Sequence, residues 1–387
     1  MEYDFDRTLD HRKTTSARWL QPEGRNDVIG MGTADLDFYC PPCVEEANMK
    51  VCKENTFNYR YKPRSYYQAV TSWFRRHYQL ELPATWLSNI PGTLGAVHMC
   101  LCRFTHPGDW VIIQSPYFMP LKASIEAAGC HFLENPMKLV EGRYEIDFAD
   151  FEEKVRKYRP SIFLLVNPQN PTGRVFTREE LEQLVEICDR YQVLILSDEV
   201  HFLVTYDGRK HIPIYGVSRR AQEISIQIFS YSKGFNIMSI PHAMVFIADP
   251  ELRRKWEDYV YGFNFNYASN SFAIASVTAV AGGQADGWLD QLTAYLQGNR
   301  DYFLEAVARL GLPLKPLKPE ASFLFWIDCR ESGIPGEKLK DFFLEKAGIS
   351  LNNGLDHGET GRGFVRMNFG VTRKTLETAV DRLQKAF

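Results

Sequence analysis

The sequence predicts an α/β fold with a large, mostly parallel β-sheet domain and a smaller α+β domain. Short apolar runs of the kind buried in parallel sheets recur through the middle of the chain and alternate with helix-like segments. After about residue 270 the pattern changes to long amphipathic helices mixed with a few strands. With 387 residues and 45% hydrophobic content, the chain is long enough for two to three globular units around a large core.

The elements of the large sheet are expected in a regular order. A Pro-Gly-Thr turn at residues 91–93 opens a helix over 94–106. A capping box at residues 177–180, in which a Thr hydroxyl and a Glu carboxylate satisfy free amides, opens a helix that reaches about residue 191. The apolar runs that indicate buried strands are residues 111–113, 162–166, 193–197, 225–229 and 243–248.

The elements of the C-terminal part divide the chain into domains. A helix is expected over residues 288–310, strands over 322–328 and 363–368, and a last helix after Thr372. We predict a large domain over residues 46–270 and a small domain over residues 271–387. The N-terminal segment, residues 1–45, is too short to fold alone and is expected to pack with the small domain.

The charge and hydropathy of the chain exclude several classes of function. Lys and Arg number 45 against 48 Asp and Glu, so the net charge of −3 lacks the basic excess that nucleic-acid binding needs. No run approaches the roughly 18 to 20 apolar residues that span a bilayer, and the N-terminus lacks the apolar core of a secretory peptide. We expect a cytoplasmic protein that acts on a small molecule, without nucleic-acid or membrane partners.

The eight cysteines are scattered and do not form a disulfide framework. Cys40-Pro-Pro-Cys43 has the spacing of a redox or zinc motif. Its two prolines forbid the helix start of a thioredoxin motif, and no second Cys/His pair lies at a finger-like distance. The sequence therefore predicts no metal site and core thiols for most of the cysteines.

Polar segments follow the predicted strands, at the ends where parallel sheets bind ligands. Each segment alone has an ordinary explanation as a turn, a helix cap or a surface charge. Together they offer a helix N-terminus for a phosphate, a carboxylate for a protonated ring nitrogen, an amide for a phenolic oxygen and an amine for an imine. Pyridoxal phosphate carries all four of these groups. The segments are residues 91–95, 167–173, 197–199 and 230–233.

Ordered motifs extend this interpretation over nearly the whole chain. They are Asp10-His11-Arg12-Lys13-Thr14-Thr15-Ser16-Ala17-Arg18-Trp19, Ala34-Asp35-Leu36-Asp37-Phe38, Ser197-Asp198-Glu199-Val200-His201, Ser232-Lys233-Gly234-Phe235-Asn236 and Gly363-Phe364-Val365-Arg366-Met367-Asn368-Phe369. With them the sequence resembles the fold-type I pyridoxal-phosphate enzymes of the class I/II aminotransferase family. More narrowly, it is similar to the carbon–sulfur β-lyase branch known as the MalY/PatB or cystalysin-like group.

The resemblance implies the residues that handle the cofactor ring and the substrate. Lys233 would bond covalently to the cofactor, and Asp198 would pair with the pyridinium nitrogen. Asn170 would donate to the phenolic oxygen, and Tyr117 would stack on the ring. Arg366 would clamp the substrate carboxylate with a bidentate pair, for which a planar guanidinium is well shaped.

The resemblance also implies the remaining cofactor contacts and a subunit partner. The phosphate would lie at the Thr93 and Leu94 amides and the Ser230 hydroxyl. His201 belongs to the same cofactor-binding set. Tyr59 would reach the neighbouring site from a second subunit, which implies a homodimer.

The chain departs from the branch at positions that border the substrate rather than the reacting bonds. Gln169 replaces a common His, and three other segments differ from the usual residues. They are Asn58-Tyr59-Arg60, where Gly-Tyr-Thr is usual, Met238-Ser239-Ile240, where an Ala-Gly-Leu type is usual, and Asp356-His357-Gly358, where Phe-Gly is usual. The sequence therefore determines the chemistry more closely than the substrate.

The implied reaction is an α,β-elimination on cystathionine, cysteine or an S-substituted cysteine, which gives a thiol, pyruvate and ammonia. The Lys233 amine would act as the general base. An aminotransferase would use nearly the same residues and is the main alternative. Ser230-x-x-Lys233 also fits the acyl-serine pattern of penicillin-recognising enzymes, but the chain has no Lys-Thr-Gly element. A non-catalytic regulator on this fold would be expected to lose Lys233 or Arg366, and both are present.

Overall fold

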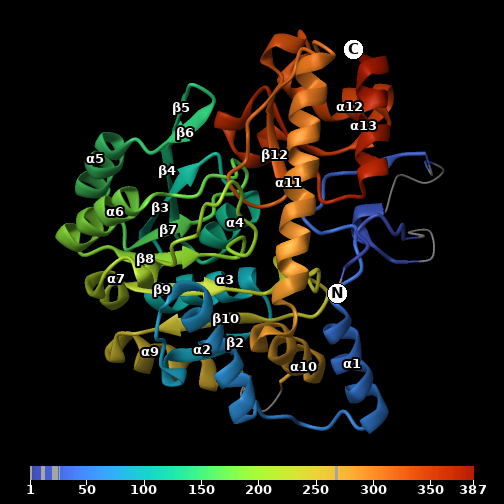
Figure 1. Cartoon of the computed structure of the whole chain (residues 1–387). Coiled ribbons are helices and arrows are strands. Elements are labelled where there is room, and N and C mark those ends of the chain that lie inside the picture. Colours follow the sequence, from blue (N-terminus) through green and yellow to red (C-terminus); the bar gives the residue numbers. More distant parts are fainter. Residues whose placement is uncertain (1, 10–13, 20–24, 26, 266–268) are drawn as a thin grey trace.

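The structure is a computed structural model that describes residues 2–9, 14–19, 25, 27–265 and 269–387 (Figure 1). Residues 10–13, the start of the predicted N-terminal motif, lie outside the described residues. A seven-stranded sheet and a four-stranded sheet organise the fold. Figure 1 shows helices on both sides of the larger sheet, while α11, α12 and α13 lie beside the smaller one.

The larger sheet confirms the predicted, mostly parallel architecture. Its strands run in the order β2-β10-β9-β8-β7-β3-β4, and β10 is antiparallel to both of its neighbours while the other pairs are parallel. The sequence did not indicate β2 and β4, because these edge strands carry polar residues in place of a continuous apolar run. The strands are β2 (Leu87–Ile90), β3 (Trp110–Ser115), β4 (His131–Pro136), β7 (Ile162–Val166), β8 (Leu194–Asp198), β9 (Ser225–Phe229) and β10 (Ala243–Ile247).

Both faces of this sheet are buried, which explains the apolar runs of its central strands. In β7, Ile162, Leu164 and Val166 belong to one hydrophobic cluster, and Phe163 and Leu165 belong to the other. Alternate side chains of a strand point to opposite faces, so a strand covered by helices on both sides is apolar throughout. The helices of this part are α3 (Thr93–Phe104), α4 (Met119–Ala127), α5 (Phe148–Tyr158), α6 (Arg178–Tyr191), α7 (Arg219–Glu223) and α9 (Pro250–Tyr261).

The predicted capping box at the start of α6 is confirmed. The Thr177 hydroxyl accepts from the Glu180 amide at 3.2 Å, and the Glu180 carboxylate accepts from the Thr177 amide at 2.7 Å. The same carboxylate binds the buried Arg174 guanidinium. The cap therefore also fixes the loop that follows β7.

The smaller sheet is antiparallel and has the order β11-β12-β15-β14. The predicted strand over residues 322–328 begins two residues later, because Ser322 has a φ of 68° and is not extended. The elements of this part are α11 (Asp286–Arg309), β11 (Lys315–Pro316), β12 (Leu324–Asp328), α12 (Leu339–Ala347), β14 (Asn352–Asn353), β15 (Phe364–Asn368) and α13 (Arg373–Ala386).

The N-terminal residues contact the C-terminal part of the chain. Strand β1 (Ile29–Gly30) pairs in parallel with β13 (Ile349–Ser350), and the Phe5 ring lies 5.5 Å from the Trp288 and Tyr295 rings. The predicted domain limits at residues 45 and 270 remain predictions. Helices α1 (Pro42–Glu54), α2 (Arg64–Tyr78) and α10 (Ser271–Ala279) lie at the lower end of the view in Figure 1.

Within the ranges that the structure describes, we find no helix with both the length and the apolarity that a bilayer crossing demands. The cytoplasmic location remains a prediction.

Candidate active site

The parallel strands carry the predicted site residues to one edge of the larger sheet. Asp198 is the last residue of β8, Asn170 lies in the loop after β7, and Lys233 lies in the short helix α8 (Ser232–Phe235) that follows β9. Because the carboxyl ends of parallel strands lie at the same edge, these side chains converge. The smaller sheet adds Arg366 from β15, and the Arg366 guanidinium donates to Asn170 Oδ1 at 3.1 Å.

Lys233 is held by the N-terminal segment. Its Nζ donates to the Ala34 carbonyl at 2.6 Å. Burial and the nearby Arg366 charge lower the pKa of Lys233 to about 8, against the opposing attraction of Asp35 and Asp198. At pH 7 about a tenth of this amine is therefore uncharged, far more than for an ordinary lysine, and a nucleophile or general base must be uncharged.

Asp198 is a buried carboxylate with few partners. One of its oxygens accepts from the Val200 amide at 3.2 Å. Burial raises the pKa of Asp198 to about 6, and the neighbouring Glu199 raises it further while Lys233 opposes the shift. A cationic group placed against this carboxylate would restore its charge, which is what a protonated ring nitrogen would do.

We expect Asp198→Asn to stabilise the ligand-free protein at neutral pH. The folded pKa of about 6 lies above the ordinary 3.8, so between about pH 4 and pH 6 the unfolded chain loses this proton while the folded protein keeps it, and the free energy of unfolding falls. At about 1.4 kcal/mol per tenfold change in proton affinity, the free energy of unfolding should rise by about 3 kcal/mol above pH 6. Urea unfolding at pH 4 and pH 7.5 measures this difference.

Asp207→Asn provides a control in which the free energy of unfolding should change in the opposite direction. Hydrogen bonds from Arg300 lower the pKa of Asp207 to about 2, so its charge stabilises the fold above about pH 4, and the stabilisation is lost as the pH falls through 2. The asparagine variant should therefore lose stability at pH 7.5. An Asp198→Asn protein that is no more stable than the wild type at pH 7.5 would contradict the burial of an unfavourable charge.

Arg366 is a buried cation, and the atoms that accept its hydrogen bonds within the described ranges are all neutral. Besides Asn170 Oδ1, it donates to the Gly32 carbonyl at 3.0 Å and to Asn352 Oδ1 at 2.8 Å. Its Nε has no hydrogen-bond partner among the described residues, and burial lowers the pKa of the guanidinium to about 10. A positive charge held by dipoles and left with a free donor suits an anion such as a substrate carboxylate.

Asn170 and His201 present further polar atoms. Because Asn170 Oδ1 accepts from Arg366, the amide NH₂ group of Asn170 is left as a donor. His201 forms a hydrogen bond of 2.9 Å between its Nδ1 and Ser322 Oγ. Burial, with the charges of Lys233 and Arg366, lowers the pKa of His201 well below its ordinary value, so its ring is neutral.

The N-terminus of α3 forms an open cradle for an anion. Gly92 has a φ of 92°, and a Cβ placed on Gly92 or Gly95 would meet no atom within 4 Å. The first intrahelical bond runs from the Ala96 amide to the Gly92 carbonyl, so the Thr93 and Leu94 amides precede the bonded turn and can bind a ligand.

Ser230 and Tyr117 have well-defined surroundings in this region. The Ser230 hydroxyl donates to the His242 carbonyl at 3.0 Å and accepts from the Ser232 amide at 3.2 Å. The buried Tyr117 ring packs edge-on against Phe132, with 4.9 Å between the ring centroids. Burial raises the pKa of Tyr117 to about 12, so the phenol stays uncharged.

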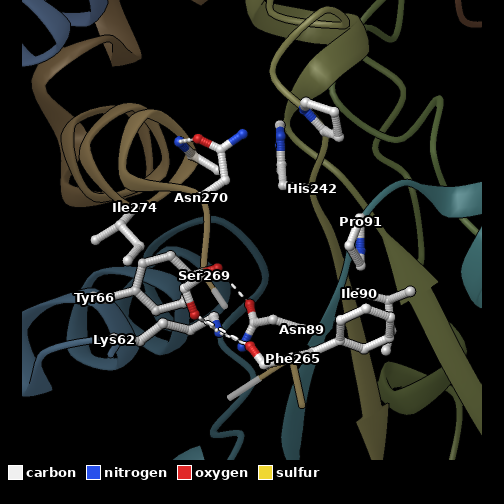
Figure 2. A pocket seen from close by; sticks show the side chains of 12 residues that line it. Lys62, Tyr66, Asn89, Ile90, Pro91, His242, Phe265, Ser269, Asn270 and Ile274 are labelled. Atoms are coloured by element: carbon white, nitrogen blue, oxygen red, sulfur yellow. Dashed lines mark hydrogen bonds between the residues drawn. The ribbon is translucent and has the colours of Figure 1, made fainter. Parts of the chain in front are cut away.

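A cavity of about 150 Å³ adjoins this region (Figure 2). Pro91 and His242 form part of its wall, next to the α3 cradle and the partner of Ser230. Lys62 reaches in from the opposite side and donates to Ser269 Oγ at 2.7 Å. Burial lowers the pKa of Lys62 to about 8.

Tyr59 does not take part in its own site. Its side chain is 81% exposed, and it lines a second surface cavity together with Tyr61. The predicted contact of Tyr59 with a neighbouring subunit therefore remains a prediction.

Several contacts that hold the site come from residues to which the sequence analysis gave no role. They include the Ala34 and Gly32 carbonyls, Asn352, and Asn236, which accepts from the Leu36 amide at 3.2 Å and donates to the Phe38 carbonyl at 2.6 Å. The motif at residues 34–38 was a signal for the first of these contacts. Nothing local in the sequence indicated Asn352.

Cys43 lies in the first turn of α1, and Cys40 lies two residues before that helix begins. Burial raises the pKa of both thiols, that of Cys43 to about 11. They are therefore protonated and unreactive at neutral pH. In the ranges given above, no three His, Cys, Asp or Glu side chains gather as a metal-binding group.

Comparisons with known proteins give a consistent result. The model of the family "Aminotransferase class I and II" matches residues 26–383. The cystathionine beta-lyase PatB of Bacillus subtilis (strain 168) is 32% identical over 387 residues, which cover 99% of each chain. Cystalysin from Treponema denticola, whose crystal structure contains pyridoxal 5'-phosphate, matches with a TM-score of 0.95 at 25% identity over 100% of this chain and 99% of that one. The PLP-bound C-S lyase from Staphylococcus hominis matches with a TM-score of 0.92 at 26% identity over 100% and 98% of the two chains.

Proposed function

Because this chain belongs to the class I and II aminotransferase family, we propose that Lys233, Asp198 and Arg366 carry out a pyridoxal-phosphate-dependent carbon–sulfur β-elimination. The enzyme is a lyase of the cystathionine β-lyase type, which releases a thiol, pyruvate and ammonia from a sulfur amino acid. The observation that carries the assignment of residues is the convergence of one amine, one buried carboxylate and one guanidinium with a free donor at a single sheet edge.

The residues present fit pyridoxal phosphate. The open α3 cradle and Ser230 suit its phosphate, and the carboxylate of Asp198, whose pKa is raised by burial, suits its protonated ring nitrogen. The free NH₂ of Asn170 suits its phenolic oxygen. When bound, the cofactor supplies an electron sink for the charge left on the substrate α-carbon.

Three side chains of this protein have separate roles in the reaction. Arg366 binds the substrate carboxylate and thereby fixes one end of the amino acid. Lys233 takes the α-proton onto Nζ, which requires the uncharged amine that its lowered pKa provides. Asp198 keeps a proton on the ring nitrogen, because a buried carboxylate without a cation is unfavourable.

We expect S-methylcysteine to give equal amounts of pyruvate and methanethiol without any keto-acid co-substrate. Elimination breaks the carbon–sulfur bond, so the sulfur leaves as a thiol and the three-carbon fragment hydrolyses to pyruvate and ammonia. Coupled pyruvate detection and a thiol reagent measure both products. A sulfur-containing keto acid, formed only when a second keto acid is supplied, would instead identify an aminotransferase.

We also propose that the protein forms a homodimer. Phe57, Tyr59 and Tyr61 are 64%, 81% and 76% exposed and alternate along one segment of the chain. A run of exposed aromatic residues is typical of a protein–protein interface. In a two-fold symmetric dimer the same surface of each copy forms the interface. If this segment lies in that interface, Tyr59 would approach the partner's site.

A further inference from the structure

Residues 352–358 contact both the Arg366 guanidinium and the Tyr117 segment. Asn352 lies opposite Arg366 in the β14–β15 pair and accepts from Arg366 Nη2 at 2.8 Å. A few residues later, His357 and Gly358 lie against Tyr117. We call residues 352–358 the clasp. The proposed carboxylate site and the proposed stacking ring are thus joined by one short segment.

Two reciprocal hydrogen bonds tie His357 to Tyr117. The Tyr117 amide donates to the His357 carbonyl at 3.0 Å, and His357 Nδ1 lies 3.0 Å from the Tyr117 carbonyl. Because a carbonyl only accepts, Nδ1 must carry the proton. Burial and the Arg366 charge lower the pKa of His357 to about 3, so the imidazole remains neutral in this tautomer over the working pH range.

Gly358 brings the clasp against the Tyr117 ring. Its φ is 98°, which favours glycine, and a Cβ at this position would lie 2.9 Å from Tyr117 Cε1 and 3.2 Å from Cζ. Such distances are shorter than van der Waals contact. Any side chain at residue 358 would therefore displace the ring edge.

The clasp is itself fixed by local contacts. The Asn353 side chain accepts from the Leu355 amide at 2.9 Å, and the Asp356 carboxylate accepts from the Asn353 amide at 3.1 Å. Asn353 also donates to the Gly336 carbonyl at 2.8 Å. A turn that is held in this way can transmit a displacement from one end to the other.

We propose that His357 is a positioning residue that sets the Tyr117 ring against the cofactor, and that the clasp couples this ring to the Arg366 carboxylate site. The inference rests on the proposed function. In the branch that the chain resembles, Phe-Gly is usual here, and a phenylalanine cannot donate to the Tyr117 carbonyl. This histidine therefore adds a constraint on Tyr117 that the usual residue lacks.

The test compares His357→Phe with the matched variant His357→Asn. Phenylalanine keeps a ring but removes the donor, whereas the asparagine amide nitrogen takes the place of Nδ1. Loss of one hydrogen bond should weaken cofactor binding by about fivefold in His357→Phe. The visible circular dichroism of the bound cofactor should also change, because the stacking ring moves. His357→Asn should restore both to within about twofold. Titration of the cofactor-free protein with pyridoxal phosphate gives the affinities.

A second measurement addresses the coupling to Arg366. Propionate offers a carboxylate without an amine, so it can occupy the Arg366 site but cannot react. At saturation it should shift the visible circular dichroism of the wild type and of His357→Asn, and leave that of His357→Phe nearly unchanged. A wild-type spectrum that propionate does not alter would contradict the coupling.

The outcomes separate this inference from the proposed function. A wild-type protein that takes up no pyridoxal phosphate would refute the function itself. Wild-type affinity and spectrum in His357→Phe would refute the positioning role while leaving the function intact. Should His357→Phe fail to fold, Gly358→Ala keeps both hydrogen-bonding partners and displaces the ring, and an unchanged spectrum in that variant would equally overturn the proposal.

Discussion

Lys233→Ala is expected to lower the rate of pyruvate release by about 10⁴-fold or more, because one amine serves as both nucleophile and general base. It should also abolish the covalent attachment of the cofactor. Treatment of the wild type with borohydride fixes the cofactor to the protein, which raises the mass of the intact chain. The alanine variant should show no such increase.

Lys62 offers a matched control for this experiment. It too is a partly buried lysine whose pKa burial lowers to about 8, and it lies in the cavity beside the α3 cradle. Lys62→Ala should keep the borohydride-dependent mass increase. A mass increase that survives in Lys233→Ala and disappears in Lys62→Ala would transfer the covalent role to Lys62.

Arg366→Ala is expected to raise the KM for S-methylcysteine by about 10²- to 10³-fold with a smaller effect on kcat, because it removes charge-assisted hydrogen bonds to the carboxylate. Arg366→Lys keeps the charge but loses the bidentate geometry, so its KM should be intermediate. Steady-state kinetics on the three proteins measure this order.

The amide of S-methylcysteine tests whether Arg366 binds the substrate carboxylate. The wild type should prefer the free acid over the amide by a large factor in kcat/KM, because only the acid carries the negative charge. In Arg366→Ala that preference should fall close to one. A variant that still prefers the acid as strongly as the wild type would mean that another cation holds the carboxylate.

The fold and the centre of the candidate site were predictable because they depend on local sequence. The central strands are buried on both faces, so their apolar runs indicate strands whatever the rest of the chain does. Asn170, Asp198 and Lys233 each follow such a run, and parallel strands bring their carboxyl ends to one edge. The edge strands β2 and β4 carry no such signal, since one of their sides has no partner strand and their residues are mixed.

The residues that could do the chemistry were recognisable from the sequence, whereas the contacts that hold them in place depend on the tertiary structure. Lys233 binds a carbonyl 199 residues away, Arg366 binds an amide 196 residues away, and His357 binds a carbonyl 240 residues away. These contacts depend on how the two sheets and the N-terminal segment dock, and no local periodicity encodes docking. The lowered pKa of Lys233 and the raised pKa of Asp198 follow from the same cause, because burial by distant segments, more than any neighbour in the sequence, removes water from both groups.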